Sequence, residues 1–123
     1  MQAEGSKGAG DYLTGGVTEV EAVFDECGMI NKVPRYKAEF VKLQASCSEK
    51  DTLVYIALKE STFNKDAKNK DSSASGLYQF LTSSWNYYQC GDDIWNVEQQ
   101  SNCAVKVMRK GLTYDTWMRW WNI

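Results

Sequence analysis

Glu60 is the residue of this sequence whose position most suggests chemistry. It lies near the start of the stretch IALKESTFNKDAKNKDSSASGLYQF, which runs from Ile56 to Phe80. Leu53, Ile56, Ala57 and Glu60 are spaced i, i+3, i+4 and i+7, so they share one face of a helix. We predict that Glu60 lies on the core-facing side of that helix, in its last turn, and points toward the polar loop that follows.

A carboxyl group in that position is suited to donate a proton near neutral pH. Burial disfavours the charged carboxylate and raises its pKa. The negative end of the helix dipole acts in the same direction, because it disfavours a nearby anion. Such an acid could protonate the oxygen of a glycosidic bond. The alternative interpretation is a solvated glutamate at a frayed helix end.

The residue inventory excludes several other chemistries. The chain contains no histidine, so neither a Ser-His-Asp nor a Cys-His nucleophile can form. Proton transfer would then fall to carboxylates, tyrosine or lysine. No Cys-x-x-Cys pair occurs either, so we expect no metal site. We also expect no cofactor. The 14 basic and 16 acidic residues are scattered without a Lys/Arg stripe, which argues against nucleic acid and membrane surfaces as partners.

An even number of cysteines in a short chain favours two disulfides and an oxidising compartment. Our first choice is the two pairs that are local in sequence, and four buried free thiols in a cytosolic protein stay open as the alternative. The compartment would be periplasmic, extracellular or virion-associated. The favoured pairs are Cys27–Cys47 and Cys90–Cys103.

Apolar periodicity predicts a mainly α domain with five to six short helices and at most a small β-hairpin. Residues 1–16 are rich in Gly and small polar residues, so we expect a flexible arm before a domain over residues 17–123. Residues 61–75 should form a polar loop or hairpin, and Gly76 should need a positive φ or a close backbone approach. No apolar run reaches the length of a membrane span, and no signal peptide is visible. The helices are expected to begin at Thr18, Pro34, Ser48, Thr82–Ser84, Asn96 and Thr113 or Asp115. Gly28 should stop the first helix, and the second, with Phe40 on its buried side, should end near Ala45–Cys47. Gln99 should complete a capping box with Asn96, that helix should run to Gly111, and the last helix should be rich in Trp.

A longer motif surrounds Glu60 and covers about a fifth of the chain. It consists of Glu60-Ser61-x-Phe63-Asn64-x-x-Ala67, then Ser73-Ala74-Ser75-Gly76-Leu77-Tyr78-Gln79-Phe80, then Trp85. This set of spacings resembles the core motif of the lysozyme-like superfamily, and most closely its soluble lytic transglycosylase branch.

The resemblance implies an enzyme that cleaves the β-1,4 bond between N-acetylmuramic acid and N-acetylglucosamine in peptidoglycan, and we expect the chain to be a monomer. Glu60 would act as general acid and then as general base. Gly76 and Gln79 would line the cleft and hold the sugar, with Ser75 supporting Glu60 or a sugar hydroxyl. Tyr78 would contact substrate or simply pack, and Gln79 could instead be an amide that caps the loop. Trp117 is our best candidate for an aromatic ring that stacks on a sugar.

The sequence departs from the family pattern in two places. The family's later Ala-Tyr-Asn-Ala-Gly segment is absent, so Tyr87, Tyr88 and Tyr114 are all candidates for the tyrosine near the acid. Animal-type lysozymes carry an aspartate two residues before the turn glycine, where this chain has Ala74. Hydrolysis needs a second carboxylate, for which Asp71 is the nearest candidate, with Asp66 behind it. A lytic transglycosylase needs none, because the sugar's own C6 hydroxyl attacks, and this reaction is the one we favour.

Two other classes of function stay open. One is a glycan-binding or assembly module of the same fold without turnover, within a larger phage or secretion assembly. The other is a small secreted disulfide scaffold whose motif arises by chance.

Overall fold

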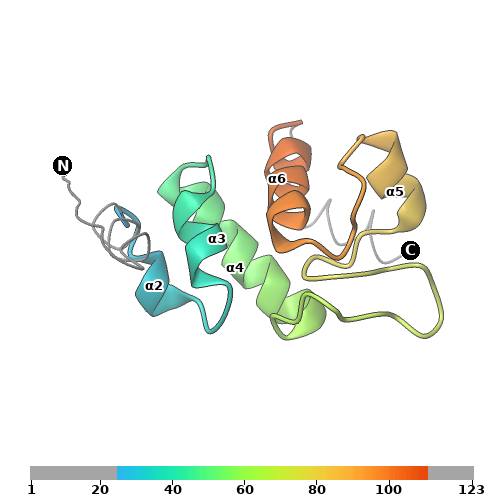
Figure 1. Ribbon diagram of the computed structural model, residues 1–123, viewed down its shortest axis with the longest axis horizontal. Coiled ribbons are helices and arrows are strands. Elements are labelled where there is room, and N and C mark those ends of the chain that lie inside the picture. The colour runs from blue at the N-terminus through green and yellow to red at the C-terminus, as the bar shows by residue number, and fades with distance from the viewer. Residues whose placement is uncertain (1–24, 111–123) are drawn as a thin grey trace. The chain divides into compact units, whose positions relative to one another are not determined.

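The computed structural model describes residues 25–110 (Figure 1). Its contacts divide the chain into two compact units, Met1–Lys42 and Leu43–Ile123. The predicted arm over residues 1–16, the helix from Thr18 and the last, Trp-rich helix lie outside the described residues.

The first unit contains two short helices in contact, α2 (Met29–Lys32) and α3 (Lys37–Lys42). Asp25 caps α2: its two carboxylate oxygens accept the backbone N–H groups of Met29 at 2.7 Å and Ile30 at 2.9 Å. Gly28, which the sequence marks as a helix stop, takes a left-handed conformation with φ 69° immediately before α2.

Helix α3 is shorter than predicted at both ends. It begins at Lys37 rather than Pro34, because Tyr36 adopts a left-handed conformation with φ 59° and its carbonyl accepts the N–H of Phe40. It ends at Lys42, before the predicted end at Ala45–Cys47. The extended Ser46, which caps the next helix, stops any continuation. Phe40 is fully buried, as its spacing predicts.

The second unit begins with the longest described helix, α4 (Cys47–Ser61). The prediction of Ser48 as its N-cap is wrong, because Ser46 is the cap. The Ser46 hydroxyl accepts the Glu49 N–H at 3.1 Å, and the Glu49 carboxylate accepts the Ser46 N–H at 2.9 Å. A capping box needs an acidic or amide residue at the third helical position, and Glu49 meets that spacing only from Ser46.

A long connection over residues 62–81 leads to α5 (Thr82–Tyr87), and α6 (Val97–Met108) follows (Figure 1). The described part of this connection has isolated bridges, Lys68 with Ser75 and Ser75 with Phe80, and no strand. Helices α4 and α6 are in contact. The fold is therefore mainly α, as predicted.

Two predicted caps differ in detail from the structure. Thr82, Ser83 and Ser84 lie inside α5, whose N-cap Leu81 has no side-chain cap. The hydroxyl of Ser73 instead accepts the Thr82 N–H at 3.0 Å from the preceding loop. Tertiary folding thus supplies a cap that local sequence could not indicate.

Asn96 caps α6 as predicted, since its side chain accepts the Gln99 N–H at 2.9 Å. Gln99 does not complete a capping box, because its amide bonds Asp93 and Asp92 instead. The helix ends at Met108, before the predicted stop at Gly111.

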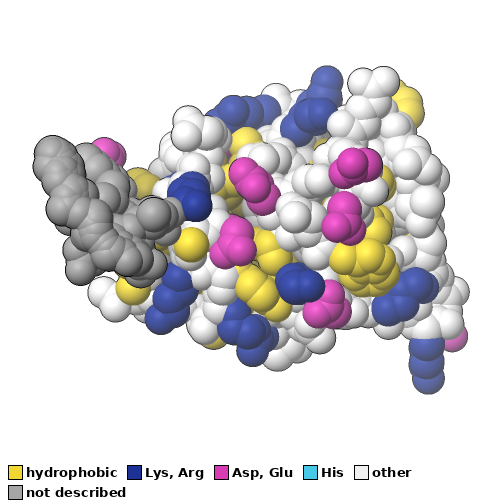
Figure 2. All heavy atoms as spheres, viewed as in Figure 1, with side chains coloured by type: hydrophobic (Ala, Val, Ile, Leu, Met, Phe, Trp, Pro, Cys, Tyr) yellow, Lys and Arg dark blue, Asp and Glu magenta, His cyan; other side chains and the backbone are white. Residues whose placement is uncertain are grey.

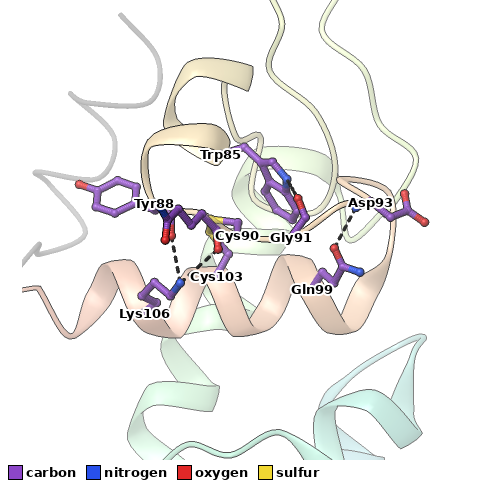
Figure 3. Close-up of a disulfide and its surroundings, with 9 residues drawn as sticks. Trp85, Tyr88, Cys90, Gly91, Asp93, Gln99, Cys103 and Lys106 are labelled. Carbon is purple, nitrogen blue, oxygen red and sulfur yellow. Dashed lines mark hydrogen bonds between the residues drawn. A yellow bond between two sulfur atoms is a disulfide. The ribbon is translucent and has the colours of Figure 1, made fainter.

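A disulfide joins Cys90, in the loop after α5, to Cys103 in the middle of α6 (Figure 3). Beside it, Lys106 Nζ donates to the carbonyl of Tyr88 at 2.9 Å, and Trp85 Nε1 donates to that of Gly91 at 2.9 Å. The pairing of Cys90 with Cys103 confirms that prediction. Cys27 and Cys47 are also disulfide-bonded, so the structure is compatible with an oxidising compartment.

The described surface shows basic and acidic side chains interspersed, without a continuous basic stripe on the face in Figure 2. Between residues 25 and 110, no helix has the length and apolar character needed to cross a membrane. Over the same residues, no group of His, Cys, Asp and Glu side chains is placed to hold a metal ion.

Candidate active site

Glu60 lies in the last turn of α4, where the apolar stripe of the helix ends. Leu53, Ile56 and Ala57 on the same face are fully buried, whereas Glu60 is half-buried. Its carboxylate is therefore carried by a rigid helix and sits at the boundary between core and solvent.

The chain turns sharply after Glu60, and local hydrogen bonds hold that turn. Ser61 Oγ donates to the carbonyl of Ala57 at 3.0 Å and accepts the Asn64 N–H at 3.1 Å. Thr62 and Phe63 are both left-handed, with φ 53° and 60°. The buried Phe63 anchors the turn, and its N–H donates to the carbonyl of Ala57 at 3.1 Å. The backbone on both sides of Glu60 is thus fixed.

The segment that the motif pairs with Glu60 forms a closed turn over residues 75–80. Ser75 and Phe80 exchange backbone hydrogen bonds of 2.9 and 3.0 Å, and the Gly76 N–H donates to the carbonyl of Ala67 at 2.8 Å. Gly76 has φ 82°, and a Cβ atom there would lie 2.7 Å from Gln100 Cδ. Both expectations for Gly76, a positive φ and a close approach, are confirmed.

The residues predicted to hold substrate in this turn are buried, and most of their polar atoms hold the turn itself. Ser75 Oγ donates to the carbonyl of Ser73 at 2.8 Å. The Tyr78 hydroxyl is 2.7 Å from Ser101 Oγ, and burial raises the pKa of Tyr78 well above its usual range. Tyr78 is fully buried, so in this structure it packs in the core.

Gln79 differs from its neighbours because part of its amide has no described partner. Its Nε2 donates to the carbonyls of Gly76 at 2.8 Å and Ala67 at 3.2 Å. Its Oε1 accepts no hydrogen bond from the residues that the structure describes, although the side chain is only 6% exposed. Gln79 therefore caps the loop through Nε2, and its Oε1 remains an acceptor without a partner among the described residues.

Asp71, the predicted second carboxylate, lies exposed in the loop between α4 and the turn. Its backbone N–H donates to Asn69 Oδ1 at 2.7 Å, while Lys68 Nζ bonds the carbonyls of Asn69 and Ser72. The Asp71 carboxylate makes no hydrogen bond or ion pair with the described residues. Ala74, at the position of the lysozyme aspartate, is 4% exposed.

Among the predicted aromatic contacts, Trp117 and Tyr114 lie outside the described residues. Trp85 is in the core, and Tyr87 is 76% exposed. Tyr87 and Tyr88 meet edge to face at 5.0 Å beside a hollow of about 340 Å³, which Ser83 and Ser84 also line. Glu60 does not line this hollow.

Sequence reasoning missed Gln100, which is fully buried in α6 and accepts the Leu77 N–H at 2.8 Å. A signal existed, because Gln100 is three residues after Val97 and four before Ala104, on the apolar stripe of the helix. A polar residue on such a stripe needs buried partners.

The Transglycosylase SLT domain family matches residues 38–122, more than two thirds of the chain. The chain belongs to this family. The match includes α4 with Glu60, the connecting loop, the turn over residues 75–80, α5 and α6. It confirms the resemblance to the lytic transglycosylase branch of the lysozyme-like superfamily. Membership supports lytic transglycosylase-type activity on peptidoglycan at the level of the family. Searches of curated proteins and of solved structures return no match.

Proposed function

We propose that this protein cleaves the β-1,4 bond between N-acetylmuramic acid and N-acetylglucosamine as a lytic transglycosylase, with Glu60 as the catalytic carboxyl. The observation that carries the proposal is the half-buried Glu60 at the end of α4, inside the family match, in a motif that has a buried Ala74 where an animal-type lysozyme has aspartate. The disulfides favour a periplasmic, extracellular or virion-associated site of action.

One carboxyl suffices for this reaction. Protonated Glu60 gives its proton to the glycosidic oxygen, the bond from C1 of N-acetylmuramic acid to that oxygen breaks, and N-acetylglucosamine leaves with a free 4-hydroxyl. The Glu60 carboxylate then takes the proton of the C6 hydroxyl on the same N-acetylmuramic acid. The C6 oxygen bonds to C1 and closes a 1,6-anhydro ring, and Glu60 is protonated again. No water is consumed.

The turn over residues 75–80 would form a wall of the sugar site. Gln79 Oε1, which has no partner among the described residues, is suited to accept a hydrogen bond from a sugar hydroxyl or amide. Gly76 and Ser75 would contribute backbone to the same wall, Tyr78 would support it from the core, and Trp117 would stack on a sugar ring.

A lysozyme-type hydrolase is the second candidate, because the exposed Asp71 carboxylate has no partner among the described residues. In a hydrolase it would act as nucleophile or activate water.

Mass spectrometry of digested peptidoglycan tests the proposal. Transglycosylation gives 1,6-anhydro products that are lighter than hydrolytic products by one water. Glu60→Gln should abolish both product types, while Glu98→Gln, an exposed glutamate on α6, serves as the matched control and should keep full activity.

Hydrolytic products whose yield falls in Asp71→Asn would replace the proposal with the lysozyme reaction. Glycan binding without any product would replace it with a non-catalytic module in a larger assembly. Full activity in Glu60→Gln would remove the assignment of the acid.

A further inference from the structure

Gln100 joins three separate segments of the second unit through one buried side chain. Its Oε1 accepts the Leu77 N–H at 2.8 Å, and its Nε2 donates to the carbonyls of Ile94 at 2.8 Å and Lys65 at 3.2 Å. Both amide hydrogens of the side chain are therefore used. Leu77 belongs to the turn over residues 75–80, and Lys65 belongs to the segment that leaves Glu60.

The turn over residues 75–80 leaves room for the Gln100 side chain at Gly76. A Cβ atom on Gly76 would lie 2.7 Å from Gln100 Cδ, 2.8 Å from Oε1 and 2.9 Å from Nε2, all too close for a carbon atom. Gly76 therefore leaves the space that the Gln100 amide fills, in addition to providing its positive φ. A fully buried amide is tolerated only because its hydrogen bonds are made.

The segment between Glu60 and the turn has little regular structure to hold it. Its described part contains isolated bridges and local loop bonds, and no strand ladder. The Gly76 N–H and Gln79 Nε2 bond the Ala67 carbonyl directly, and Gln100 adds a buried connection between the same two segments, from Lys65 to Leu77.

We propose that Gln100 is a positioning residue of the candidate active site, which sets the spacing between the Glu60 segment and the turn over residues 75–80. The inference rests on the proposed function. Gln100 acts through Lys65 and Leu77 and does not touch the substrate. A displacement of about 1 Å between reacting groups can lower a rate about 100-fold, so loss of this connection should reduce kcat.

The test compares Gln100→Met, which keeps the shape of the side chain and removes its hydrogen bonds, with Val107→Ala. Val107 is fully buried in the same helix and takes part in none of the hydrogen bonds that join Gln100 to the turn, so its truncation destabilises α6 and leaves those bonds in place. Both are assayed on soluble uncrosslinked glycan strands, well below their unfolding temperatures. We expect Gln100→Met to lower kcat about 100-fold and Val107→Ala to keep it near the wild-type value.

Hydrogen exchange of the Leu77 amide gives a second readout. It should accelerate in Gln100→Met and stay protected in Val107→Ala at equal global stability. If Gln100→Met does not fold, Gln100→Glu replaces it, because a carboxylate keeps the acceptor for Leu77 and loses both donors. The same loss of kcat is expected.

The outcomes separate the two proposals. Wild-type cleavage that Glu60→Gln abolishes, together with full kcat in the Gln100 variant, would overturn the positioning role and leave the proposed function intact. Equal loss of kcat in Gln100→Met and Val107→Ala would show that Gln100 serves stability alone. If the wild-type protein forms no cleavage product, the proposed function fails and the positioning role fails with it.

Discussion

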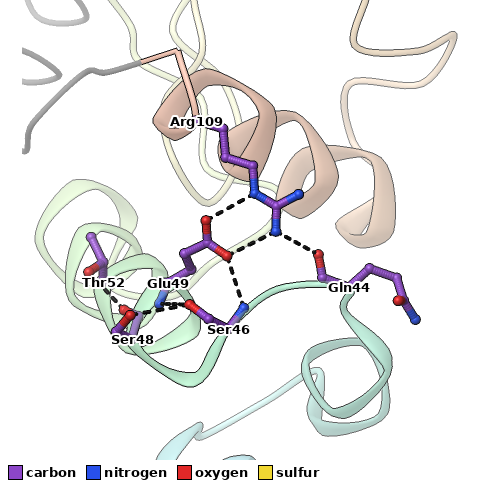
Figure 4. A network of polar contacts seen from close by, with 6 residues as sticks. All are labelled: Gln44, Ser46, Ser48, Glu49, Thr52 and Arg109. Carbon is purple, nitrogen blue, oxygen red and sulfur yellow. Dashed lines mark hydrogen bonds and ion pairs between the residues drawn. The ribbon is translucent and has the colours of Figure 1, made fainter.

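Helix α6 is held in two different ways near its two ends. Toward its N-terminus, the fully buried Gln100 binds three backbone groups. At its C-terminus, Arg109 Nε and Nη2 each donate to a carboxylate oxygen of Glu49 at 3.0 Å (Figure 4). That second pair is at the surface, with the Arg109 side chain 56% exposed and Glu49 24% exposed.

The two connections differ in the changes of side chain and pH that they tolerate. The Gln100 amide is enclosed and neutral, so a change of shape or charge there leaves unpaired buried groups. The Arg109–Glu49 pair is screened by solvent, and surface pairs of this kind contribute about 1 kcal/mol or less. Only the surface pair responds to pH, because the Arg109 hydrogen bond, followed by the Ser46 backbone N–H, lowers the pKa of Glu49 from 4.5 to about 2. The end of α6 that bonds the turn over residues 75–80 is therefore the end that tolerates fewer changes.

The largest effect is expected from Gly76→Ala, which forces a methyl group into the Gln100 amide. Left-handed backbone strain and overpacking together should destabilise the protein by about 3 kcal/mol. Gly28→Ala is the matched control, because Gly28 also has a positive φ but open space around an added Cβ. It should cost about 1 kcal/mol. Urea unfolding measures the stability of both variants. Equal losses of unfolding free energy would show that the Gln100 side chain moves aside at little cost.

Removal of the disulfide between Cys90 and Cys103, which holds the middle of α6, should give the next largest effect. Replacing both Cys90 and Cys103 with Ala opens a loop with a sequence separation of 13 residues and should lower the free energy of unfolding by about 3 kcal/mol or slightly less. Because the turn over residues 75–80 keeps its Gln100 contacts, kcat of the folded protein should change little. Loss of kcat as large as in Gln100→Met would mean that any restraint on α6, and not Gln100 in particular, positions the site.

The smallest effect is expected from Glu49→Gln, which keeps the capping box with Ser46 and removes the ion pair with Arg109. At pH 7 it should cost about 0.5 kcal/mol. In the wild type, the unfolded chain binds a proton at Glu49 more readily than the folded chain does. The ion pair therefore stabilises fully above pH 4.5, and this contribution is lost as pH falls toward 2.

Chemical unfolding at a series of pH values checks this pH dependence. Between pH 4.5 and 2, the free energy of unfolding should fall less steeply in Glu49→Gln than in the wild type. Lys110→Gln is the control, because it removes a neighbouring cation whose side chain makes no hydrogen bond or ion pair with the described residues. It should keep the wild-type slope. An unchanged slope in Glu49→Gln would mean that the pair does not persist in solution.

The sequence by itself determined the features that depend on local spacing. The i, i+3, i+4, i+7 pattern placed Leu53, Ile56 and Ala57 in the core, with Glu60 at the end of the same stripe. Gly76 could be assigned a positive φ and a close approach from its residue type and context. The motif around Glu60 led to the family that the match over residues 38–122 then showed. These inferences succeed because helix periodicity and glycine geometry are properties of a few neighbouring residues.

Only the tertiary structure decided which residues from distant parts of the chain contact each other. The cap of α5 comes from Ser73, and the partner of Gly76 is Gln100, which is 24 residues further along the chain. Tyr78 and the amide nitrogen of Gln79 face inward, although their motif positions suggested contacts with substrate. Burial and hydrogen-bond satisfaction are set by segments distant in sequence, so the local pattern could mark Gln100 as a residue that needs buried partners but could not reveal that one partner is the turn over residues 75–80.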